Sequence, residues 1–95
     1  MHTSICFDEA RRVLADMIAI RSVNPMGREF TGSAPVERGI VEYLEEMFRP
    51  YGVVMERQTY SAMHENLLIR VPGGSGPHTL LESHIDTVPA DDWEE

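Results

Sequence analysis

Lysine is absent from this chain, and its eight strongly basic side chains are all arginines. Asp and Glu together number 16, so the formal net charge is −8. A chain this acidic repels a phosphate backbone and an anionic lipid surface, and we therefore expect binding neither to nucleic acid nor to membranes. The acidity favours cations in general, but charge alone does not define a site.

Cysteine is almost as scarce, because Cys6 is the only one. A single cysteine cannot form an internal disulfide, which fits a reducing compartment. No apolar run is long enough to span a bilayer. The first residues include Asp8 and Glu9 and lack the apolar core of a secretory signal. We therefore expect a cytoplasmic protein.

Two stretches show the apolar spacing of three and four residues that is typical of amphipathic helices. The first predicts a helix over residues 7–20, ended by Asn24 and Pro25, since a residue before proline avoids the helical region. The second predicts a helix from Pro35 to position 49 or 50, with Gly52 as its stop.

Beyond Gly52 the pattern changes to that of β-strands. Residues 53–60 and 66–71 predict a hairpin, residues 72–77 a turn, and residues 78–85 a third strand. The expected fold class is α/β: two helices, then about three strands of a larger mixed sheet. Apolar residues on both sides of the third strand predict burial on both faces. The helices can cover one face only, so we expect more chain or a partner on the other.

His84 and Asp86 are the candidate site residues. In a strand, residues two apart project from the same face, so the two side chains are expected to point the same way. A neutral imidazole binds zinc through one nitrogen, and a carboxylate on the other nitrogen orients the ring. A bare His-x-Asp pattern occurs often by chance, and it is then an exposed strand end.

The longer string around this pair is more specific. It resembles the first signature of the zinc aminoacylase superfamily, which includes acetylornithine deacetylase, succinyl-diaminopimelate desuccinylase and carboxypeptidase G. The string runs Leu80, Leu81, Glu82, Ser83, His84, Ile85, Asp86, Thr87, Val88, Pro89 and Ala90. Two further segments are similar to the family in order and spacing: residues 21–25, which read RSVNP, and residues 66–73, which begin with Asn66. Ser83 stands where the family commonly has glycine.

The resemblance implies a hydrolase of amide bonds, a deacylase or exopeptidase, in which two Zn²⁺ ions activate a water molecule; Co²⁺ or Mn²⁺ would be substitutes. His84 would be a metal ligand, and Asp86 the catalytic acid that orients it. Substrates would be small N-acylated amino acids or peptides, and the full-length protein would be able to form a homodimer. Residues 1–95 would be the incomplete N-terminal part of the catalytic domain, with no second domain.

The remaining ligands and the general base would lie beyond Glu95, so we expect the chain alone to be inactive. Glu94 and Glu95 follow Pro89 too closely to be the family's glutamate pair, and Glu82 is better explained as an exposed strand residue. His64 and His78 are expected at the surface. Two alternatives stay open: a non-catalytic half-domain or binding module that needs a partner chain, and a remnant without function.

Overall fold

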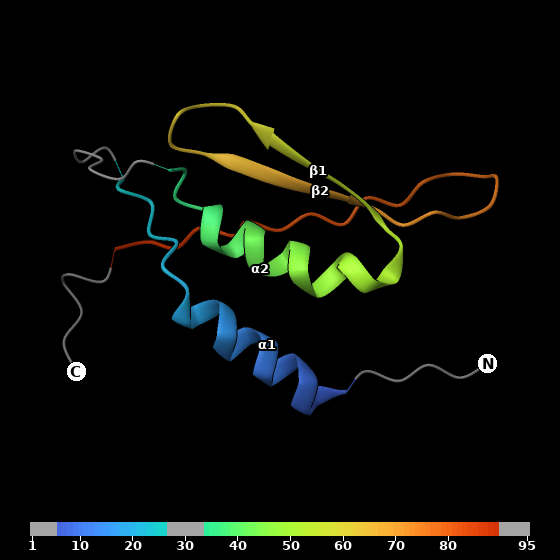
Figure 1. Ribbon diagram of the computed structural model, residues 1–95, viewed down its shortest axis with the longest axis horizontal. Helices are drawn as coiled ribbons and strands as arrows, with labels where there is room; N and C mark the ends of the chain where they lie inside the picture. Colours follow the sequence, from blue (N-terminus) through green and yellow to red (C-terminus); the bar gives the residue numbers. More distant parts are fainter. Residues whose placement is uncertain (1–5, 27–33, 90–95) are drawn as a thin grey trace.

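The structure is a computed structural model that describes residues 6–26 and 34–89. Its elements are α1 (Phe7–Ala19), α2 (Arg38–Phe48), the 3-10 turn η1 (Arg49–Tyr51), β1 (Val54–Thr59) and β2 (Glu65–Arg70) (Figure 1). β1 and β2 form an antiparallel two-stranded sheet in which Val54 lies opposite Arg70. The predicted α/β class is confirmed. Neither described helix has both the length and the apolarity needed to cross a membrane.

α1 forms from the first apolar stripe and ends one residue earlier than predicted. Asp8 and Glu9 occupy its first turn, where carboxylates stabilise the partial positive charge of a helix N-terminus. No residue of α1 is buried, and Ile18 is 73% exposed. The hydroxyl of Tyr43 in α2 donates a hydrogen bond to Asp16 Oδ2 at 3.0 Å. α1 is therefore exposed along much of its length, and the bond from Tyr43 links it to α2.

α2 begins at Arg38, three residues later than predicted. Residues 35–38 form a separate turn ahead of α2, in which the Arg38 amide donates to the Pro35 carbonyl oxygen at 3.1 Å. The Val36 amide donates to the carbonyl oxygen of Met63 at 2.8 Å, which ties this turn to the hairpin loop. Gly52 follows η1 with a φ of 66°, the left-handed conformation expected of a helix stop. Ile40 and Val41, which are 2% and 0% exposed, are the fully buried apolar residues of the described chain.

The hairpin matches its prediction to within one residue at each strand end. Two ion pairs attach it to α2. Arg57 of β1 contacts Glu45 at 2.6 Å, and Arg38 of α2 contacts Glu65 at 2.7 Å. Together with the contacts of Ile40 and Val41, these pairs place α2 against the sheet.

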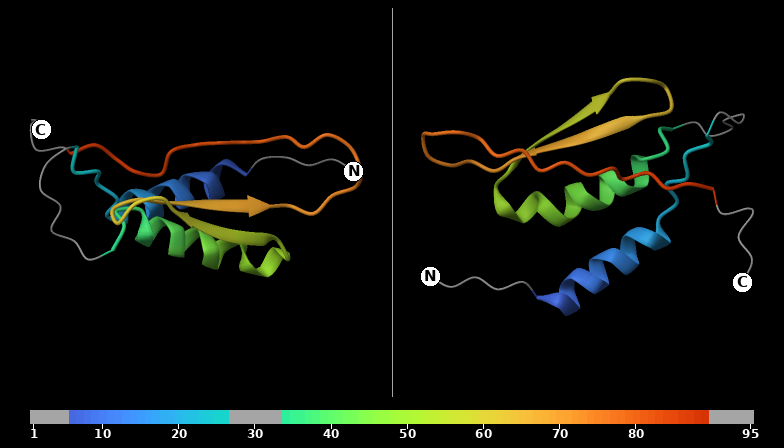
Figure 2. Two further views of the ribbon diagram at one scale, coloured as in Figure 1. Left: turned by 90° about the horizontal axis from the view of Figure 1, so that it is seen from above. Right: turned by 180° about the vertical axis from the view of Figure 1, so that it is seen from behind.

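The third strand predicted over residues 78–85 is wrong, because this segment forms no strand. It is extended chain that runs back past α2 towards the C-terminal end of α1 (Figures 1 and 2). A strand is stabilised by hydrogen bonds to a neighbour. Outside β1 and β2, the described residues form one such link, a parallel bridge between Val23 and Thr87. Leu80 and Leu81 are 75% and 89% exposed, so the burial expected for this segment is absent as well.

Candidate metal site

The candidate site lies where the extended segment meets the chain leaving α1. Two backbone hydrogen bonds make the junction: the Asn24 amide donates to the Thr87 carbonyl oxygen, and the Thr87 amide donates to the Ser22 carbonyl oxygen, each at 2.8 Å. Ser22 is only 2% exposed. The backbone on the C-terminal side of Asp86 is therefore held against residues 22–24, although 62 positions separate Asn24 from Asp86.

His84 and Asp86 contact each other, as the sequence pattern predicts. His84 Nδ1 lies 3.0 Å from the backbone oxygen of Asp86 and 3.4 Å from its carboxylate Oδ1. A carbonyl oxygen and a carboxylate only accept hydrogen bonds, so in the neutral ring the proton belongs on Nδ1. Nε2 then carries the free lone pair that a metal ligand requires. The His84 side chain is 85% exposed, which leaves it accessible.

The Asp86 carboxylate is better enclosed, with 29% of its side chain exposed. Asn24 Nδ2 donates a hydrogen bond to Asp86 Oδ2 at 2.9 Å. This bond holds the pKa of the Asp86 carboxyl below its usual value; partial burial opposes the effect, and the Asp86 backbone amide and the His84 ring lower the pKa further. Asp86 is therefore ionised at neutral pH, and its carboxylate can accept a hydrogen bond from the His84 ring.

The fit to a metal is partial. No group of three His, Cys, Asp or Glu side chains converges within residues 6–26 and 34–89. The site offers one imidazole nitrogen and the carboxylate that orients the ring, whereas a catalytic zinc usually has three protein ligands. Glu82 is exposed. Glu94 and Glu95 lie outside the described residues. The donors present thus suit one ligand position of a zinc site and do not complete it.

No protein-family model matches this chain, and no solved structure matches it significantly.

A second polar cluster, which the sequence analysis missed, joins α2 to the hairpin. Glu65 is 1% exposed and accepts two hydrogen bonds from Arg38, at 2.7 and 3.1 Å. Glu37, 4% exposed, contacts His64 Nδ1 at 2.9 Å and accepts from the Glu65 amide. The expected surface position of His64 is wrong, because only 20% of its side chain is exposed and its ring stacks on Tyr60. Every carboxylate here has a partner, so the cluster is explained by packing.

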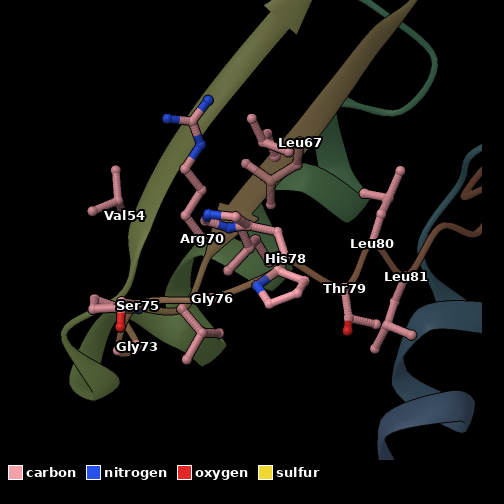
Figure 3. A pocket seen from close by; sticks show the side chains of 16 residues that line it. Val54, Leu67, Arg70, Gly73, Ser75, Gly76, His78, Thr79, Leu80 and Leu81 are labelled. Atoms are coloured by element: carbon pink, nitrogen blue, oxygen red, sulfur yellow. The ribbon is translucent and has the colours of Figure 1, made fainter.

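An open groove of about 1110 Å³ lies between the end of the hairpin and the following loop (Figure 3). Its walls are mostly apolar, and Arg70 and His78 are its ionisable side chains. The lining ends at Leu81, so neither His84 nor Asp86 contributes to it. The groove and the candidate metal site are separate features.

Proposed function

We propose that this chain supplies one metal ligand, His84, to a two-zinc hydrolase of amide bonds. The observation that carries the proposal is the contact between His84 Nδ1 and Asp86, which leaves Nε2 exposed. That is the arrangement required of a metal-binding histidine and its supporting acid. The string over residues 80–90 supports the same function through its resemblance to the zinc aminoacylase superfamily.

His84 would contribute its Nε2 lone pair to a bound zinc ion. Zinc in such a site would supply an activated water and polarise the substrate carbonyl. The backbone oxygen and carboxylate of Asp86 hold the proton on Nδ1 and thereby fix which nitrogen faces the metal.

The proposed substrates are small N-acylated amino acids or peptides, and the complete enzyme would be able to form a homodimer. Other parts of that enzyme would supply the bridging carboxylate, the general base and the remaining ligands, so residues 1–95 alone should not turn over substrate. We further propose a cytoplasmic location, which the single cysteine supports. If the proposal holds, the reading frame in the intact gene continues past Glu95 into further acidic ligands; a stop there contradicts it.

Paramagnetic Co²⁺ tests the ligand directly. Low concentrations added to the chain should broaden the ring protons of His84 before those of His78, which lies on the groove and serves as the internal control. Affinity will be weak, because one protein ligand is present where three are usual. In His84→Ala no other ring should broaden at these low Co²⁺ concentrations, and in His78→Ala the broadening at His84 should persist. Equal broadening of both rings would contradict a metal site at His84.

A second candidate is a non-catalytic half-domain that acts with a partner chain. It is favoured by the exposed apolar residues of α1 and of the segment after the hairpin, among them Phe7 at 76% and Leu81 at 89%. Soluble monomers rarely leave extended apolar patches uncovered. Light scattering over a concentration series tests this candidate. A monomeric chain that stays well dispersed would contradict it.

A further inference from the structure

Asn24 uses both ends of its side-chain amide. Its Nδ2 donates to Asp86 Oδ2 at 2.9 Å, and its Oδ1 accepts a hydrogen bond from the Met26 amide, also at 2.9 Å. Met26 has a φ of 55°, a left-handed conformation that is uncommon for a residue other than glycine. The backbone at Met26 therefore folds towards the Asn24 side chain and donates a hydrogen bond to it.

The contact with Met26 fixes which end of the amide faces Asp86. The oxygen and nitrogen of an asparagine side chain are nearly interchangeable in shape, so their assignment must come from the hydrogen bonds. A backbone N–H can only donate, so the asparagine oxygen must face Met26. The NH₂ group must then face Asp86, where an ionised carboxylate can only accept.

This bond engages one carboxylate oxygen and leaves the other for His84. Asn24 holds Oδ2, while Oδ1 lies 3.4 Å from His84 Nδ1. The backbone bonds between residues 22–24 and Thr87 fix the main chain next to Asp86, but they do not fix rotation of its side chain. Among the described contacts, Asn24 is the group outside residues 84–86 that restrains this rotation.

We propose that Asn24 is a positioning residue of the metal site: it orients the Asp86 carboxylate so that His84 keeps its proton on Nδ1 and presents Nε2 to zinc. This inference rests on the proposed function for its metal, but the link from Asn24 through Asp86 to the His84 ring is a property of the chain by itself. The proposed role of Asn24 also gives a function to the RSVNP segment, to which the sequence analysis assigned no site residue.

The experiment reads the tautomer of His84 by long-range ¹H–¹⁵N NMR of the ring, in alkaline solution where the ring is observed in its neutral form. The Nδ1–H form should dominate in the wild type. It should fall towards the mixture of an unrestrained imidazole in Asn24→Ala. Asn24→Asp should have at least as large an effect, because it keeps an oxygen for the Met26 amide and sets a second carboxylate against Asp86.

Asn66→Ala, which truncates an exposed asparagine in β2, is the matched control and should leave the tautomer unchanged. Circular dichroism, together with amide exchange at Thr87, verifies that each variant keeps its fold. An unchanged tautomer in folded Asn24→Ala and Asn24→Asp would overturn the inference, since the Asp86 backbone oxygen would then suffice to hold the ring.

Zinc titration of the same samples separates this inference from the proposed function. Loss of a group that directly orients a metal ligand costs about 10-fold to 100-fold in metal affinity. Asn24 acts through Asp86, so Asn24→Ala should weaken zinc binding by up to about 10-fold. Failure of the wild-type His84 ring to respond to zinc contradicts the proposed function. Equal zinc affinity in the wild type and Asn24→Ala contradicts the role of Asn24.

Discussion

The hydrogen bond between Asn24 and Asp86 should appear as a coupling free energy in the stability of the chain. The perturbation is a double-mutant cycle of Asn24→Ala, Asp86→Ala and the two together. Asp86→Ala also removes the carboxylate contact with His84, so the coupling contains the bond between Asn24 and Asp86 and the part of the His84 contact that depends on Asn24. The cycle therefore measures the link that joins the two ends of the described chain.

The expected magnitude follows from the geometry. The donor–acceptor distance is 2.9 Å and the acceptor is ionised. Hydrogen bonds to charged groups contribute about 1.5–3 kcal/mol. The Asp86 side chain keeps 29% of its exposure, so water competes for it. We therefore expect a coupling of about 1–1.5 kcal/mol, below the range for a fully buried charged acceptor.

Urea unfolding followed by far-ultraviolet circular dichroism at neutral pH provides the four free energies. The free energy of unfolding must fall with urea concentration at the same slope in all variants, because a changed slope indicates an altered native or denatured state. A control cycle of Asn66→Ala with Asp86→Ala should be additive to within about 0.5 kcal/mol. A coupling for Asn24 that falls within that additive range would refute the proposed link.

Three further predictions concern stability. Ile40→Ala should lower the free energy of unfolding by about 2–4 kcal/mol because Ile40 is 2% exposed, whereas Leu80→Ala, at 75% exposure, should change it by less than about 0.5 kcal/mol in the same urea titration. Because the pKa of Asp86 is lowered in the folded chain, its carboxylate stabilises the fold at pH values above the usual carboxyl pKa, and this stabilisation is lost as the pH falls through the lowered pKa. The free energy of unfolding measured against pH should show this loss in the wild type and not in Asp86→Asn. An identical profile in the two would contradict the prediction. Gly52→Ala should lower the free energy of unfolding by about 1 kcal/mol, because φ at Gly52 is 66° and no atom lies near the added methyl group, so the cost comes from the backbone alone. The control Gly73→Ala, which also has open space around the methyl group, should lower it by less in the same thermal unfolding experiment.

The helices and the hairpin were predictable because their signals are local. Apolar spacing marks α1 and α2, and the change of period at Gly52 marks the start of β1. The start of α2 was misplaced because residues 35–38 form a separate turn, and the tie between this turn and Met63, 27 positions from Val36, is not encoded by any local pattern. The prediction of a third strand was wrong for a related reason. Residues 78–85 have the composition of a strand, but composition does not provide a neighbour, and pairing depends on chain segments that come together only in the fold.

In the candidate site too, local contacts were predictable from the sequence and long-range contacts were not. His84 and Asp86 are two positions apart, so their meeting followed from the geometry of extended chain. The role of Asn24 did not follow, because 62 positions separate it from Asp86. Its one signal in the sequence was membership of the RSVNP segment at the end of α1. The buried cluster of Glu37, Glu65 and His64 was equally hidden, since charged residues near loops are normally solvated.

The most direct test of a zinc site at His84 is the ¹⁵N shift of its two ring nitrogens during a zinc titration of the wild-type chain. The structure predicts that Nε2 responds and that Nδ1 keeps its proton, because the backbone oxygen of Asp86 lies 3.0 Å from Nδ1. A response at Nδ1 in place of Nε2, or the absence of any response at His84 at zinc concentrations that shift His78, would contradict the account.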